Sequence, residues 1–481
     1  MSAMHPWRGL IGLALMGGLT AYAQTEPRTI PMALEARFDP VHIDGGEPLG
    51  LLSTALLFEA SPDWWLGPVV VGAATGHRGG FFVLGGQIER RWRVGEQWRA
   101  QLSLMAGGGG GAGAPVGGGL MVQPAASLLY DWGPVQTGLS WSRVNVPSGR
   151  IGSSQFGLIV NWDGRFAYFD HALIGAASGA DASTGLGFDR LMLTTDLLRS
   201  TSMRLAGVRA EHRVSPHAYW GVEAAAATHG GADGYMELLG SVGWDATASM
   251  LGLNSLHVGA RAALGMGGGG AVPTGGGAMG KVAGVLRWDL GPDVFVGFET
   301  GQVRAAGGAY RAHYTQWQLG LQLDHSGRTE LDRVVGVDWV ASLQHVPSAA
   351  RKTGTAKALD TMGIKVRRSI WGPVYVTGQA HSAFAGGAGA YSLGLAGMGW
   401  RSSGPQADWS VGAELLAGAA GGGGVATQGG AVAQALLYVS QRVGRGQAVQ
   451  FGLGRVRSQQ GGLNSPVLDI SWSQTFGLGP R

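Results

Sequence analysis

The sequence alternates apolar and polar residues over many short segments, and this alternation restricts the backbone to β-strands. The last segment carries apolar side chains at one parity and polar side chains at the other: Leu468, Ile470, Trp472 and Phe476 against Asp469, Ser471, Ser473 and Thr475. Successive side chains of a strand point to opposite faces, so a period of two is typical of a strand with one apolar face. The sequence therefore predicts an all-β protein.

The first residues have the three-part layout of a secretory signal peptide. Arg8 precedes an apolar stretch, and small residues end in Ala21-Tyr22-Ala23 before Gln24. The apolar stretch is shorter than the ~20 residues that a spanning helix requires. We expect cleavage after Ala23, which leaves residues 24–481 as a protein outside the cytoplasm.

The composition narrows the class of protein further. The 481 residues include 88 Gly and 17 Trp, and only 14% are charged, which is unusual for a soluble enzyme. There are 0 Cys, so disulfides cannot stabilise the fold. Within a bilayer, backbone polar groups are satisfied only by helices or by closed sheets. Because no later apolar run is long enough for a spanning helix, we expect a transmembrane antiparallel β-barrel.

Internal repetition divides the mature sequence into three units. Glycine runs begin at Gly107, Gly267 and Gly421, at offsets of 160 and 154 residues. A second landmark, marked by Arg143, Gln302 and Arg455, recurs at offsets of 159 and 153 residues. Self-similarity at a fixed period indicates repeated structural units. We place these units at about 30–165, 185–325 and 335–477, and expect about eight strands in each and about 24 in total.

Two architectures agree with this repetition. One is a single barrel of about 24 strands with a wide lumen, and the other is three tandem eight-stranded barrels filled by side chains. The expected inward positions are often Gly, Ser or Gln, which would fill a narrow barrel poorly. The segments after Asp163 and after Asp324 also suit the continuation of one sheet. We therefore favour the single barrel and keep the three-barrel arrangement as the alternative.

The connections predict an orientation. Short turns such as Asp131-Trp132-Gly133-Pro134 and Asp289-Leu290-Gly291-Pro292 are typical of periplasmic turns, so the glycine runs fall on the extracellular side. The glycine runs are either flexible linkage or closely packed backbone of symmetry-related loops.

In its signal peptide, alternating strands, short turns and aromatic last strand, the sequence resembles Gram-negative outer-membrane β-barrel proteins as a class. The resemblance covers nearly the whole mature sequence and implies an outer-membrane location. It also implies barrel-insertion machinery and outer-membrane lipid as partners, and a channel, transport or surface-structure role. The basic residues are almost all arginine, whose guanidinium groups suit phosphate contacts on lipopolysaccharide, so we expect lipopolysaccharide as a further partner. We expect no nucleic-acid partner.

The parity of the strands selects candidate residues. We expect the lumen to be lined by Gln101, Ser103, Gly259, Arg261 and Glu414. Arg143 and Arg455 share parity with apolar residues near the outer strand ends and are candidates for contacts with lipid phosphates.

The sequence contains no recognisable catalytic set and no phosphate-binding loop, so we expect neither an enzyme nor a cofactor. His77, His229 and His381 recur at intervals of 152 residues, but the glycines around them do not keep this register, and we expect no metal site. The sequence therefore favours a non-enzymatic channel or export conduit for polar solutes or a secreted polymer. The alternative is a structural or adhesive surface barrel with glycine-rich extracellular loops.

Overall fold

The structure is a computed structural model that describes residues 26–43, 46–176, 188–199, 202–249, 252–323, 333–404 and 407–479. The expected signal peptide and Asp324 lie outside these residues. The described elements are 24 strands and one short 3-10 helix, η1 (His171–Leu173), so the predicted number of strands is confirmed. Within the described ranges, no helix is long and apolar enough to cross a membrane.

The strands close into three separate barrels of eight strands each. Barrel 1 consists of β1 (Arg28–Ile43), β2 (Glu47–Ser61), β3 (Trp64–Gly76), β4 (Phe82–Arg93), β5 (Trp98–Gly110), β6 (Leu120–Asp131), β7 (Val135–Val146) and β8 (Ile151–Tyr168). Barrel 2 consists of β9 (Arg190–Leu198), β10 (Met203–Arg213), β11 (Ala218–His229), β12 (Met236–Ala248), β13 (Leu253–Gly268), β14 (Ala278–Asp289), β15 (Val294–Ala305) and β16 (Arg311–Gln322). Barrel 3 consists of β17 (Val335–Ala349), β18 (Lys357–Trp371), β19 (Val374–Ala385), β20 (Ser392–Arg401), β21 (Trp409–Gly421), β22 (Ala431–Gly444), β23 (Gln447–Ser458) and β24 (Asn464–Leu478).

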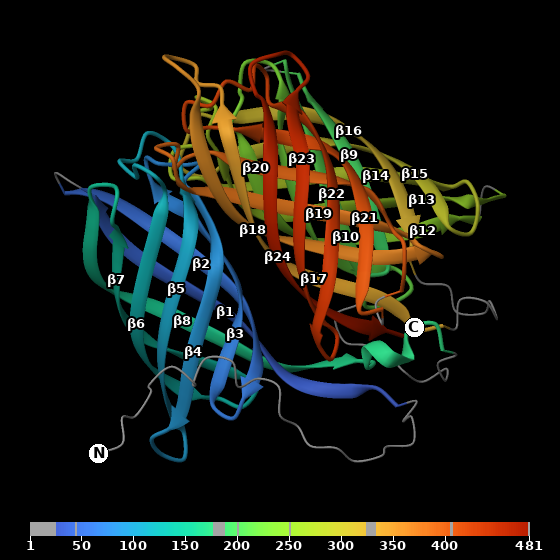
Figure 1. Cartoon of the computed structure of the whole chain (residues 1–481), viewed down its shortest axis with the longest axis horizontal. Coiled ribbons are helices and arrows are strands. Elements are labelled where there is room, and N and C mark those ends of the chain that lie inside the picture. The colour runs from blue at the N-terminus through green and yellow to red at the C-terminus, as the bar shows by residue number, and fades with distance from the viewer. Residues whose placement is uncertain are drawn as a thin grey trace.

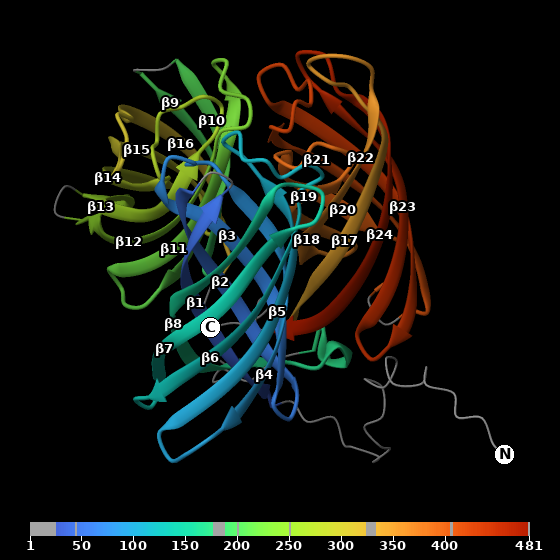
Figure 2. The same cartoon turned by 90° about the vertical axis from the view of Figure 1, so that its left-hand side faces the viewer.

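Each barrel closes by antiparallel pairing of its first strand with its last: β1 with β8, β9 with β16 and β17 with β24. Figures 1 and 2 show the blue, the green-to-yellow and the orange-to-red barrels as three distinct closed sheets. The favoured single barrel of about 24 strands is therefore wrong, and the three-barrel alternative is correct.

Two features explain this correction. The strand-like residues after Asp163 lengthen β8, which stays paired with β1 as far as Tyr168 and does not continue the sheet into β9. Long side chains, among them the buried Arg37, Arg209 and Arg367, fill the narrow interiors beside the small inward residues.

The two faces of each sheet differ in polarity as the alternation predicted. Large apolar side chains lie on the outside, where Phe156 in barrel 1 is 72% exposed, Leu264 in barrel 2 is 75% exposed and Leu437 in barrel 3 is 68% exposed. Ionic and amide side chains occupy many of the buried inner positions, and a buried apolar cluster fills each interior mainly toward the end that carries the glycine runs. Each barrel thus has an apolar outer surface and an interior that is polar in part and apolar in part.

The glycine runs join the three barrels at one end. We call the loops 107–119, 267–277 and 421–430 the glycine hub, the end of each barrel that carries them the hub end, and the opposite end, with the short turns, the turn end. The loop of barrel 2 packs on barrel 1, where the Gly79 amide donates a 2.7 Å hydrogen bond to the Gly275 carbonyl oxygen. The loop of barrel 1 packs on barrel 3, where the Gly389 amide donates to the Gly117 carbonyl oxygen at 2.9 Å.

The loop of barrel 3 completes the ring by packing on barrel 2. A Cβ atom at Gly430 would overlap the carbonyl oxygen of Ala227, and Lys352 forms a 2.7 Å ion pair with Asp233. The glycine runs are therefore closely packed backbone that connects neighbouring barrels.

One glycine of the hub provides a test of this packing. Gly277 has a φ of +101°, and a Cβ atom there would overlap the carbonyl oxygen of Ala73 in barrel 1. We expect Gly277→Ala to lower the free energy of unfolding by about 1–3 kcal/mol, because the backbone is strained and the two barrels are pushed apart.

Gly284 is the matched control, since a Cβ atom there meets nothing within 4 Å. Gly284→Ala should change the stability by no more than about 0.5 kcal/mol. The measurement is urea unfolding of the detergent-folded protein, and equal stability of the two variants would contradict the packing of the hub.

Candidate functional site

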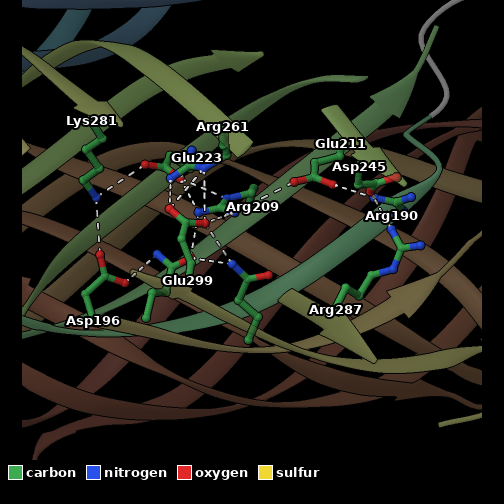
Figure 3. A network of polar contacts seen from close by, with 12 residues as sticks. Arg190, Asp196, Arg209, Glu211, Glu223, Asp245, Arg261, Lys281, Arg287 and Glu299 are labelled. Carbon is green, nitrogen blue, oxygen red and sulfur yellow. Dashed lines mark hydrogen bonds and ion pairs between the residues drawn. The ribbon is translucent and has the colours of Figure 1, made fainter. Parts of the chain in front are cut away.

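The buried polar interiors of the three barrels are the candidate site, because they hold most of the paired charges of the protein. Barrel 2 has the largest set, shown in Figure 3. At its centre, Glu299 accepts hydrogen bonds from Arg209 at 2.9 Å and from Arg261 at 2.7 Å. Glu223 accepts from the same two guanidinium groups, each at 2.9 Å. Two arginines and two glutamates therefore neutralise one another in a closed square.

The ion pairs of barrel 2 continue from this square toward both ends. Toward the hub end, the Lys281 ammonium lies 3.3 Å from Asp196 and 3.4 Å from Glu223, and it also pairs with Glu237. Toward the turn end, Arg190 pairs with Glu211 at 3.2 Å and with Asp245 at 3.1 Å. We call these residues, together with Arg209, Arg261, Glu299 and Arg287, the barrel 2 network.

A contact of 3.8 Å between Arg209 and Glu211 links the two halves of the barrel 2 network. Charged side chains therefore follow one another through the turn-end and central parts of barrel 2, and toward the hub end the interior also holds an apolar cluster that includes Leu205, Met279 and Val303. Burial of an ionic group is tolerated only with such pairing, because an isolated charge loses its hydration.

Barrels 1 and 3 have smaller networks of the same kind. In barrel 3, Lys365 pairs with Asp469 and Arg367 pairs with Glu414, both at 2.7 Å. In barrel 1, Gln101 donates to Glu35 at 2.9 Å. The three interiors thus share a polar character but differ in their residues.

The structure distributes the predicted lumen residues over three separate interiors. Gln101 and Ser103 lie in barrel 1, Arg261 in barrel 2 and Glu414 in barrel 3, and all four are buried. Gly259 is half-buried next to Asp245 in barrel 2. These residues therefore do not form one common lumen, and a role of any of them in conduction stays a prediction.

The two predicted lipid-phosphate residues lie on the outer surface. Arg143 on β7 and Arg455 on β23 are both exposed near the hub end, and the Arg455 guanidinium donates to the Asn464 amide oxygen at 2.7 Å. Binding of lipid phosphate by either residue stays a prediction.

Further interior residues share the polar parity of their strands. Glu223 and Glu299 are not among the candidates named from the sequence, although each lies at the polar parity of its strand. Their cationic partners are 38 residues away or more in several cases, and no local pattern identifies such pairs.

The three repeated histidines lie apart in three barrels. His381 is buried in barrel 3, where its Nε2 lies 3.0 Å from the Ser342 hydroxyl. In the described part of the chain, no three His, Cys, Asp or Glu side chains are arranged as metal ligands.

Outside the strands, burial raises the pKa of the Tyr391 phenol, so this loop side chain stays neutral at physiological pH.

No family model matches the sequence. No curated protein matches it either. Among solved structures, the FrpB iron transporter from Neisseria meningitidis aligns over 93% of this chain and 81% of its own, with 9% identity and a TM-score of 0.27. The outer membrane channel DcaP of Acinetobacter baumannii aligns over 95% and 100%, with 9% identity and a TM-score of 0.21. Pseudomonas aeruginosa OccK1 aligns over 93% and 98%, with 9% identity and a TM-score of 0.22.

TM-scores of this size do not identify the fold or the activity of the protein. The geometry of this protein defines its class: three up-and-down barrels, each with an apolar outer surface and an interior that contains a buried ionic network.

The barrel 2 network predicts a large difference between buried and exposed ion pairs. Glu299→Gln removes the charge that Arg209 and Arg261 share in a fully buried position, so we expect the free energy of unfolding to fall by about 3–5 kcal/mol. Asp408→Asn, at the exposed Arg442–Asp408 pair, is the control and should cost no more than about 1 kcal/mol. Urea unfolding measures both, and similar losses would show that the network is not protected from solvent.

Proposed function

We propose that this protein is a non-enzymatic structural protein of the Gram-negative outer membrane, whose three filled barrels cross the bilayer side by side. The observation that carries this proposal is the filling of the interiors by paired charges and by buried apolar side chains in barrels of only eight strands. An eight-stranded barrel has an interior just wide enough for side chains. The barrels are therefore membrane anchors, and the glycine hub is the surface that they present outside the cell.

The outer surface supports a position within the membrane. Closure of each sheet pairs the backbone groups that lipid could not satisfy. Exposed tryptophans gather at the turn end, as in the aromatic girdle of a membrane barrel: Trp64, Trp92, Trp98, Trp132, Trp288, Trp371, Trp400 and Trp409. The turn end would then lie at the periplasmic interface and the hub end at the extracellular one.

The orientation of the barrels in the membrane would determine the partners of each end. Barrel-insertion machinery would receive the chain in the periplasm, and lipopolysaccharide would surround the hub ends, where Arg143 and Arg455 can reach its phosphates.

Passage of small ions through barrel 2 is a second candidate function. The barrel 2 network provides charged side chains in the turn-end and central parts of the interior, and ion passage would require rearrangement of its pairs and of the apolar cluster toward the hub end. Export of a polymer depended on the wide lumen of a single large barrel, so it is no longer the favoured form of transport.

Reconstitution of the purified protein into planar bilayers tests the proposal. We expect insertion without steady conductance, because the interiors are filled. A stable ohmic conductance would contradict the structural role and favour ion passage, and a conductance that changes in Glu299→Gln would assign it to barrel 2. Failure to insert into vesicles of outer-membrane lipid would contradict the membrane location itself.

A further inference from the structure

One side of barrel 2 carries an open groove on its outer surface, which we call the barrel 2 groove. It crosses the neighbouring strands β12 to β15, seen at the right of Figure 1, and has a volume of about 860 Å³. Two rows of directly paired residues point outward along it: Val242, Ala262, Val282 and Gln302 in one row, and Trp244, Ala260, Gly284 and Thr300 in the other. All eight residues are exposed.

Small residues form the floor of the barrel 2 groove. Ala260, Ala262 and Gly284 carry no more than a methyl group, and a Cβ atom added at Gly284 would meet nothing within 4 Å. Neighbouring strands lie about 4.8 Å apart, so the groove runs about 14 Å across its four strands. It is therefore long, narrow and open along its length.

Larger residues occupy the corresponding surface of the other two barrels. The pair of Thr300 and Gly284 corresponds in the repeat to two pairs with larger side chains, Trp141 with Ala126 in barrel 1 and Leu453 with Leu437 in barrel 3. Trp141, Leu453 and Leu437 all face outward. At this pair of positions, the small floor is therefore specific to barrel 2.

The barrel 2 groove continues the contact between barrels 1 and 2. At the hub end, β13 and β14 pack on β3, where a Cβ atom at Gly72 would overlap the Met266 sulfur. Further toward the turn end, barrel 1 leaves the groove uncovered, because Val242, Val282 and Trp244 are 63%, 60% and 53% exposed. The hub thus lies at one end of a surface that another molecule can fill.

A single amide makes one wall of the groove polar. Gln302 lies three residues before the hub end of β15, and in the described part of the chain its side chain has no hydrogen-bond partner. The neighbouring Thr300 hydroxyl already donates to the Tyr314 carbonyl oxygen at 3.3 Å. Arg261, which contributes backbone to the lining, points its guanidinium inward to Glu299. The groove therefore offers apolar contact and amide donors but no charge.

We propose that the barrel 2 groove binds one acyl chain of lipopolysaccharide, and that the Gln302 amide donates a hydrogen bond to the carbonyl oxygen that links this chain to its head group. This inference rests on the proposed membrane location, with the hub end outside. A carbonyl oxygen only accepts hydrogen bonds, and a glutamine side chain supplies two N–H donors. In hydrocarbon an amide without a partner is costly, so this bond would favour a chain whose carbonyl group lies near the hub end.

The test is intact mass spectrometry of the full-length protein, folded in detergent, freed of lipid and titrated with lipid A. We expect one tightly retained lipid A molecule per chain. Gly284→Leu fills the floor of the groove and should weaken this binding at least about tenfold, because several methylene groups lose their contacts. The matched control is Ala126→Leu, which adds the same side chain at the corresponding outward position of barrel 1 and should bind as the unaltered protein does.

Gln302→Leu tests the polar contact, since it keeps the size of the side chain and removes its donors. We expect lipid A to bind about three- to tenfold more weakly, the effect of one neutral hydrogen bond. Unchanged binding in this variant would overturn the assigned hydrogen bond.

Three other outcomes would overturn the groove as the site. Equal loss in Gly284→Leu and Ala126→Leu would show that lipid covers the barrels without preference. Displacement of lipid A by an equal concentration of a diacyl phospholipid would assign the groove to that lipid, and a dimer in the spectra would assign it to a second copy of the chain. Insertion into vesicles separates the two proposals: a protein that inserts but retains no lipid A contradicts only the groove, whereas a protein that does not insert contradicts the proposed function.

Discussion

Closure of each eight-stranded sheet on itself is the constraint on which the rest of the structure depends. A strand edge left open in lipid would expose amide and carbonyl groups that nothing else can satisfy. Pairing of the first strand with the last removes that edge three times along the chain. It also fixes a narrow interior, which must be filled, and an outer surface that must be apolar if it faces lipid.

The interiors show how a narrow barrel can be filled with polar groups. Buried charges are costly unless each has a partner, and the square of Arg209, Arg261, Glu223 and Glu299 provides partners from strands on several sides of the barrel. Such cross-barrel pairs favour one register over its alternatives. The glycine hub closes in a similar way between barrels. Each glycine loop contacts the next barrel head to tail, and the third loop contacts a barrel already in the ring, so the three contacts form a closed ring.

The sequence predicted the strands and their polarity but not their closure. Alternation is a local property, and the alternation of β24 is visible in residues 468–476 alone. Whether β1 pairs with β8 or with β24 leaves the same local pattern, so the choice between three barrels and one could not be read from it. The size of the inward residues was misleading, because Gly259 lies beside Asp245 and two residues from Arg261, and the long side chains compensate for the small ones. The glycine runs were recognisable, but their partners belong to other barrels and leave no signal at a fixed spacing.

Disulfide cross-linking tests the separate closure of the barrels most directly, because the natural sequence has 0 Cys. Ala36 on β1 lies opposite Val160 on β8, and paired strand positions have Cα separations of about 4.5–5.5 Å, within the range that a disulfide spans. Ala36→Cys with Val160→Cys should form a disulfide on oxidation of the folded protein, and Ala36→Cys with Ile470→Cys on β24 should not. The reverse result, a cross-link from β1 to β24 and none from β1 to β8, would contradict three separate barrels and restore a single large one.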